Sequence, residues 1–158
     1  MIPAYAVARR LRRWFTGERH TKMKKDDCIF CKLANGDIPT RMIYEDDNFA
    51  VFMDMSPAAK GHSLVVPKEH YANIYEMPAE LVGEAMKVAQ KMAIKLTEAL
   101  HADGFNIVQN NGEVAGQTVF HFHMHLIPRY KEEKAVIFWT PQTVSAEELD
   151  ETLAEIVK

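Results

Sequence analysis

Three histidines alternate with apolar residues in the stretch His121-Phe-His123-Met-His125-Leu-Ile-Pro-Arg129. An alternation of period two predicts a β-strand with one buried face. The three imidazoles would then project from one side, roughly 7 Å apart, and the apolar side chains between them would enter a core. Neutral imidazole is a nucleophile and a metal ligand, and imidazolium donates hydrogen bonds to phosphate. A purely structural role would explain one histidine better than three.

Two kinds of chemistry fit this face. Alternating histidines could bind a catalytic metal ion, or one could attack a substrate while a neighbour holds the anion under attack. The preceding loop, Gly116-Gln117-Thr118, offers backbone N–H groups, an amide and a hydroxyl beside the face. Glycines there allow close approach to a phosphate. His62 begins another predicted strand that could lie near the site. Asp54 ends a predicted strand, and its carboxylate could either stabilise the following turn or bind a ligand.

The only two cysteines form the pattern Cys28-x-x-Cys31. So short a loop is an unusual place for a structural disulfide, and the pair fits a reducing, cytoplasmic setting. Metal binding, redox chemistry and no chemistry all remain open from the pattern. A redox motif is the least favoured, because no strand is evident before Cys28.

The chain has 158 residues, of which 47% are hydrophobic and 26% charged, as expected for one globular domain with a real core. Its formal net charge of −3 provides no general attraction for nucleic acid. No apolar run is long enough to span a membrane, and residues 1–22 lack the apolar core of a secretory signal. We expect residues 1–22 to be an N-terminal extension outside the core, and residues 23–158 to form a single domain with a C-terminal helix.

The site must be positioned by strands that are neighbours in sequence and by one long helix. The apolar positions between Pro78 and His101 recur at helical spacing, and Gly104 lies just past the expected helix end. The capping box Ser145-x-x-Glu148 opens a last helix. A short helix is expected over 28–35, and strands over 41–45, 49–55, 62–66, 105–109 and 120–128. This order predicts an α+β fold with an antiparallel sheet of about five strands.

The chain resembles the histidine triad superfamily. The resemblance rests on the alternating histidines, the preceding Gly116-Gln117-Thr118-Val119, and a collinear series of segments across residues 26–130. These segments are Cys28-Ile-Phe-Cys31-Lys32, Ile38-Pro39, Tyr44-Glu45-Asp46-Asp47, Asp54-Met55-Ser56-Pro57 and Gly61-His62-Ser63-Leu64-Val65-Val66-Pro67-Lys68-Glu69-His70.

The resemblance implies a nucleotide-binding hydrolase that works through a nucleotidyl-histidine intermediate, with His123 as the nucleophile and no catalytic metal. It also implies phosphate or leaving-group contacts from four residues, with His62 nearby: His125, Gln117, Thr118 and Asn110. Asp54 matches the ribose-binding position. The wall of the purine pocket is matched by Ile29, Phe30, Ile38 and Phe52.

The same resemblance assigns the cysteines to a structural zinc site. The implied ligands are Cys28, Cys31, His70 and His121, a closed Cys2His2 set. It further implies a homodimer formed through the long helix and a sheet strand.

The leaving group stays open between a nucleoside phosphoramidate and a dinucleoside polyphosphate. Thr118 and Pro128-Arg129 resemble the polyphosphate-cleaving branch, whereas Asp54-Met55-Ser56-Pro57 resembles the phosphoramidase branch. Two other classes also remain: a metal-dependent hydrolase that uses the three histidines as ligands, and a nucleotide-binding adaptor.

Overall fold

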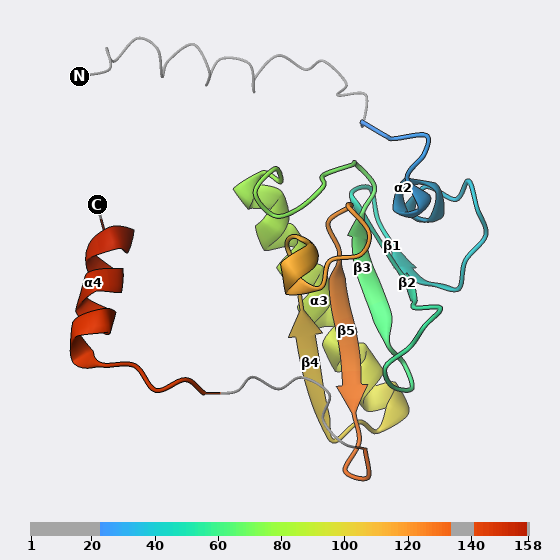
Figure 1. Ribbon diagram of the computed structural model, residues 1–158. Helices are drawn as coiled ribbons and strands as arrows, with labels where there is room; N and C mark the ends of the chain where they lie inside the picture. The colour runs from blue at the N-terminus through green and yellow to red at the C-terminus, as the bar shows by residue number, and fades with distance from the viewer. Residues whose placement is uncertain (1–22, 134–140, 158) are drawn as a thin grey trace.

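The computed structural model describes residues 23–133 and 141–157, so the predicted extension, residues 1–22, lies outside the described residues. A five-stranded antiparallel sheet has the strand order β1-β2-β3-β5-β4 (Figure 1). Its strands are β1 (Met42–Glu45), β2 (Phe49–Met53), β3 (Ser63–Pro67), β4 (Gly104–Val108) and β5 (Met124–Arg129). The helical elements are α2 (Ile29–Ala34), α3 (Ala79–Leu100), the 3₁₀ turn η2 (Glu113–Ala115) and α4 (Ala146–Ile156). The predicted α+β class and its one long helix are confirmed.

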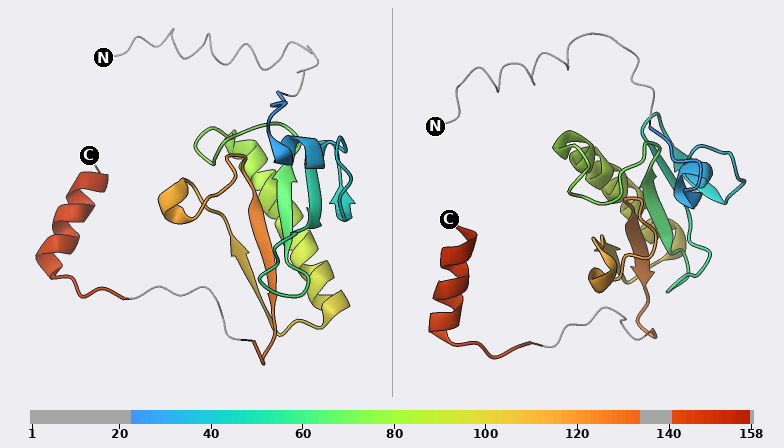
Figure 2. Two further views of the ribbon diagram at one scale, coloured as in Figure 1. Left: turned by 45° about the vertical axis from the view of Figure 1, so that its right-hand side comes forward. Right: turned by 45° about the horizontal axis from the view of Figure 1, so that its top comes forward.

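The long helix α3 covers one face of the sheet (Figure 2). Its buried residues recur at helical spacing and join the inward side chains of the sheet in one core, which includes Val65, Phe122, Met124 and Leu126. Alternate residues of the strands point the other way, where Phe52 and a second apolar cluster pack against α2. The period-two pattern therefore separates a helix-covered core from a face that is left for the site.

The histidine stretch is not one continuous strand, which corrects the prediction that a strand begins at Phe120. The ladder with β3 ends at the pair Val65–Met124. Before that point, the N–H of Phe122 donates to the carbonyl of Tyr71, and the N–H of His121 donates to the carbonyl of Val119. Only His125 lies within β5, although Phe122 still enters the core as the alternation predicts.

The end of α3 also differs from the expectation. The helix stops at Leu100, and His101 takes the left-handed C-cap conformation with φ 53°. A histidine there satisfies the role usually filled by glycine. Gly104 instead begins β4, where it pairs with Arg129. At the other end, Pro78 is the N-cap residue and not the first helical residue.

The C-terminal helix α4 begins with the predicted capping box, in which Ser145 and Glu148 exchange side-chain to backbone hydrogen bonds. It has no buried residue, and its apolar side chains, such as Leu149 and Leu153, are exposed. Among the described residues, no helix is both long enough and apolar enough to cross a membrane.

Candidate active site and metal centre

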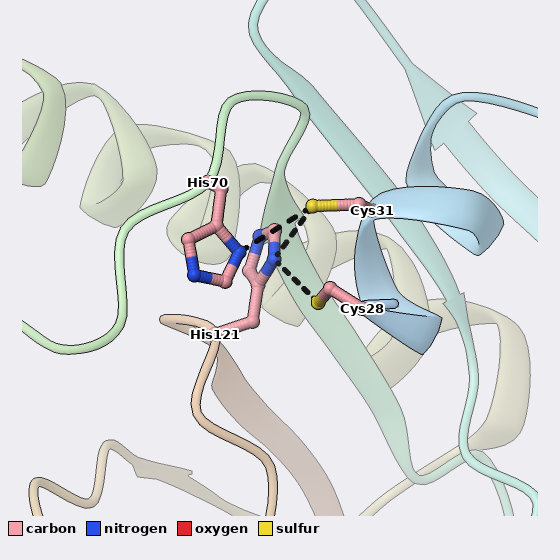
Figure 3. Close-up of side chains that lie close together, drawn as sticks. All are labelled: Cys28, Cys31, His70 and His121. Carbon is pink, nitrogen blue, oxygen red and sulfur yellow. Dashed lines mark hydrogen bonds between the residues drawn. The ribbon is translucent and has the colours of Figure 1, made fainter. Parts of the chain in front are cut away.

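Two cysteines and two histidines from distant parts of the chain converge beside the N-terminus of α2 (Figure 3). Cys28 is the N-cap residue of α2, and Cys31 lies in its first turn. His70 follows β3, and His121 precedes β5. One potential ligand atom from each of the four residues lies within 4.8 Å of every other.

The distances in this cluster match a tetrahedral metal. The Cys28 Sγ atom lies 3.4 Å from His121 Nδ1, and Cys31 Sγ lies 3.4 Å from His70 Nδ1 and 3.5 Å from His121 Nδ1. Zinc bonds of about 2.3 Å to sulfur and about 2.0 Å to nitrogen give a sulfur–nitrogen separation of about 3.5 Å at the tetrahedral angle. All four predicted zinc ligands therefore fit one zinc ion. A closed set of four ligands is typical of structural zinc sites.

The ring of His121 is oriented by the backbone. Its Nε2 donates to the carbonyl of Pro67 at 2.9 Å, and the neutral ring then has its lone pair on Nδ1, the atom that faces both sulfurs. Burial lowers the pKa of His121 to about 4, so the ring is neutral at pH 7. The orientation and the protonation state are both those of a metal ligand.

The backbone of His121 fixes the next histidine. His123 Nδ1 donates to the carbonyl of His121 at 2.6 Å. A carbonyl can only accept, so the proton of neutral His123 is on Nδ1 and the lone pair is on Nε2. Burial lowers the pKa of His123 below its usual 6.5. His123 is thus held in the form of a nucleophile or a base.

His125 is held in the opposite tautomer by a relay that begins at a backbone amide. The N–H of Ala58 donates to His62 Nδ1 at 2.9 Å, which leaves the proton of neutral His62 on Nε2. That Nε2 lies 2.9 Å from His125 Nδ1 and donates to it. Neutral His125 therefore has its own proton on Nε2. Burial, followed by the charges of His123 and His62, lowers the pKa of His125 to about 4, and burial also lowers that of His62.

Asp54 serves both the turn and the site. Its Oδ1 accepts from the N–H of Ser56 at 2.8 Å, which holds the turn after β2. Its Oδ2 lies 3.5 Å from His62 Nε2 and 3.9 Å from His125 Nδ1. The carboxylate therefore closes one side of the histidine pair.

An open cavity of about 650 Å³ lies over these groups, a size common for small-molecule sites. Its lining includes the polar side chains Asp54, His62, Thr118, His123 and His125. Its apolar lining comes from α2 and from other segments of the chain, with Ile29, Phe30, Leu33, Ile38, Phe52 and Leu64. Most of the residues predicted to bind substrate are therefore together.

Two predicted contacts lie outside this lining. The side-chain amide of Gln117 is buried and hydrogen-bonded to the backbone: its Oε1 accepts from the N–H of Gly112, and its Nε2 donates to the carbonyls of Ala72 and Val119. Asn110 is half-buried beside Gly116. Their roles toward substrate stay predictions.

Three backbone groups that set the tautomers were not foreseen from the sequence: the N–H of Ala58 and the carbonyls of Pro67 and His121. None has a signal in the residue type, because every residue has a carbonyl and nearly every residue has an N–H. Only the folded structure, which packs the 58–62 turn and the end of β3 against the histidines, identifies them.

A family model described as the HIT domain matches residues 35–132. The chain belongs to the HIT family. An uncharacterized HIT-like protein of Methanocaldococcus jannaschii is 46% identical over 82% of this chain and 98% of that protein. The adenosine 5′-monophosphoramidase of Saccharomyces cerevisiae is 36% identical over 82% of this chain and 80% of that protein.

Solved structures of HIT proteins have the same fold. The similarity to a Streptococcus mutans protein has a TM-score of 0.82 at 40% identity, and covers 90% of this chain and 91% of that one. A zinc-bound histidine triad family protein of Mycobacterium smegmatis is also 40% identical, with a TM-score of 0.67 and coverage of 83% and 96%.

We expect protein purified without added metal to contain about one zinc ion per chain, and a Cys28→Ser variant to contain much less. The reason is that the serine hydroxyl does not replace a thiolate in a tetrahedral set. Elemental analysis of both proteins measures the difference, and His101→Asn, which changes an exposed histidine outside the cluster, is the matched control. A folded, metal-free wild type would contradict the assignment.

Proposed function

We propose that the protein is a nucleotide hydrolase that cleaves purine nucleoside phosphoramidates or related nucleotidyl esters and anhydrides through a nucleotidyl-histidine intermediate. The observation that supports this most directly is the opposite tautomers of two adjacent histidines. His123 presents a lone pair to the cavity and His125 presents an N–H donor. One side chain can attack an electrophilic phosphorus while its neighbour donates to an oxygen on that phosphorus.

The proposed reaction has two steps. In the first, the lone pair on His123 Nε2 attacks the α-phosphorus, an N–P bond forms, and the bond from phosphorus to the leaving group breaks with its electron pair. His125 Nε2–H and the hydroxyl of Thr118 donate to the non-bridging oxygens, where negative charge must be stabilised. In the second step, water attacks the phosphorus and gives one proton to solvent, which replaces the proton that the leaving group takes from solvent as it departs. The N–P bond breaks, and the mononucleotide is released with His123 restored.

The remaining residues would hold the nucleoside. The apolar wall around Phe30, Ile38 and Phe52 suits the faces of a purine ring, and we assign the ribose hydroxyls to the carboxylate of Asp54, which also lines the cavity. The phosphoramidase activity of the yeast relative agrees with this substrate class. Dinucleoside polyphosphate hydrolysis is the alternative, because the same attack on the α-phosphorus needs only a different leaving group.

The geometry favours this function over a metal-dependent hydrolase. His121 faces the cysteines, so the three triad histidines do not converge on one metal. A second cluster, Asp54, His62 and His125, is compact enough for an ion. However, the Ala58 N–H places the proton of neutral His62 on Nε2, the atom that would have to bind that ion. An adaptor that binds nucleotide without needing to cleave it would use the same cavity.

We expect wild-type protein to hydrolyse adenosine 5′-phosphoramidate, and His123→Asn to lower kcat/KM by about four orders of magnitude or more, because the nucleophile is lost. Release of AMP is the measurement, and His101→Asn is the control with the same substitution at an exposed site. Calorimetry should show that His123→Asn still binds AMP. No turnover by the wild type would move dinucleoside polyphosphates and the adaptor role ahead of this substrate.

The pH profile reports the protonation of the nucleophile. Since the pKa of His123 lies below 6.5, its neutral form persists as the pH falls to that value. We expect kcat/KM to fall at acid pH with a midpoint below 6.5, as His123 becomes protonated. The His123→Asn background corrects for spontaneous acid cleavage of the substrate. A midpoint at or above 6.5 would contradict this assignment.

We also propose that the chain forms a homodimer through α3 and β4. β4 is an edge strand of the sheet, and it exposes Ile107. The helix α3 exposes Met86 and Ile94 on its outer surface. Light scattering at micromolar concentration should give twice the mass of the chain, and a monomer mass alone would overturn the proposal.

A further inference from the structure

The short helix α2 contributes side chains both to the four-residue cluster of Cys28, Cys31, His70 and His121, called here the cysteine cluster, and to the proposed nucleotide cavity. Cys28 and Cys31 face His70 and His121 (Figure 3). Ile29 and Phe30, which lie between the two cysteines in sequence, and Leu33, which follows them, form part of the apolar lining of the cavity. A displacement of α2 toward or away from the cysteine cluster would therefore also displace the wall of the cavity.

Apolar packing of Leu33 and the buried Ala34 holds the C-terminal half of α2 against the sheet, and few hydrogen bonds join the helix to the rest of the protein. With six residues, it is too short to be stable in isolation. At its C-terminal end, Asn35 Nδ2 donates to the carbonyl of Lys68 at 2.9 Å. At its N-terminal end, the polar attachments to the body are the two sulfurs and one hydrogen bond from the N–H of His70 to the carbonyl of Met23, and the ring of Phe30 adds apolar contact. The cysteine cluster is therefore the main polar anchor of the first turn.

The first turn also contacts the proposed nucleophile. The ring of Phe30 lies edge-on to His123, with 5.0 Å between ring centroids, and also contacts His121 and Phe52, each at 6.1 Å. Phe30 thus joins the cysteine cluster, the wall of the cavity and His123. His121 makes a second connection, because its ring faces the sulfurs while its carbonyl holds His123.

From this arrangement we infer that Cys28 and Cys31 form a thiol switch that controls nucleotide binding. The inference rests on the proposed function in taking the cavity as the nucleotide site. In the reduced, metal-bound state, α2 is fixed and the apolar wall is complete. In the oxidised state, the two sulfurs bind each other, the metal leaves, and α2 with Phe30 no longer holds the wall or the ring of His123.

Hydrogen peroxide is a sufficient oxidant for this step. The two thiolates lose two electrons, the Sγ–Sγ bond forms, the O–O bond of peroxide breaks, and two protons from solvent complete two water molecules. Cys28 is half-buried whereas Cys31 is buried, so Cys28 is the sulfur that peroxide reaches first. A disulfide sulfur lacks the negative charge that a thiolate offers to a metal, and the ion is released.

The test uses the full-length, zinc-loaded protein and AMP as the probe. We expect peroxide to remove both titratable thiols, to release the bound zinc to a chromogenic chelator, and to raise the Kd of AMP at least tenfold by calorimetry. Dithiothreitol with added zinc should restore the Kd, and this reversal separates cysteine oxidation from oxidation of the exposed Met55, which dithiothreitol does not reverse.

Each other outcome has a distinct meaning. If the reduced, zinc-loaded protein does not bind AMP, the proposed function fails and the switch fails with it. If AMP binds that protein and its Kd is unchanged after zinc is released, the switch alone is overturned. Zinc retained at full thiol loss, or a Kd that does not recover on reduction, also overturns it.

Two further measurements separate a local switch from unfolding. Hydrogen exchange of the oxidised protein should become faster in residues 29–34 and remain slow in α3; loss of protection in α3 would overturn a local mechanism. His70→Gln removes a cluster residue that does not line the cavity. It should weaken AMP binding before any oxidation, and peroxide should weaken it little further. The control variant His101→Asn should respond like the wild type.

Discussion

The site depends on the contacts of His121, because both of its ring nitrogens and its backbone carbonyl have partners. Its Nε2 donates to the Pro67 carbonyl, its Nδ1 faces two cysteine sulfurs, and its own carbonyl accepts from His123. One residue thereby connects the end of β3, the first turn of α2 and the proposed nucleophile. The strand ladder does not extend to this residue, because these hydrogen bonds take the place of regular pairing before Met124.

Burial gives the histidine cluster its chemical character. Desolvation disfavours the charged form of each ring, so the pKa values of His121 and His125 fall to about 4 and those of His123 and His62 fall as well. Neutral imidazoles each have one donor and one acceptor, and a single backbone partner is enough to decide which nitrogen has the proton. A cluster of charged rings could not show this division between a lone pair and a donor.

Much of the fold could be predicted from the sequence, because apolar periodicity records which side of an element is buried. The 3.6-residue period identified α3, and the alternation around Phe122 and Met124 identified their inward faces. The errors lie at element ends. There, local hydrogen bonds decide the boundary: His101 adopts the left-handed cap conformation, whereas Gly104, the glycine just past the expected helix end, begins β4.

The sequence by itself determined which residue types were available: three alternating histidines, a Cys-x-x-Cys pair and a glycine-containing loop. It left open whether the histidines share a metal or divide a reaction, because spacing along a chain does not say which atom faces which partner. The tertiary structure turns His121 toward the cysteines and away from His125, and it places a carbonyl or an N–H against particular ring nitrogens, so the three rings do not face one common point. The physical reason is that a tautomer is set by the backbone group that each ring nitrogen meets in the folded chain: for His121 and His125 this depends on residues distant in sequence, Pro67 and, through His62, Ala58.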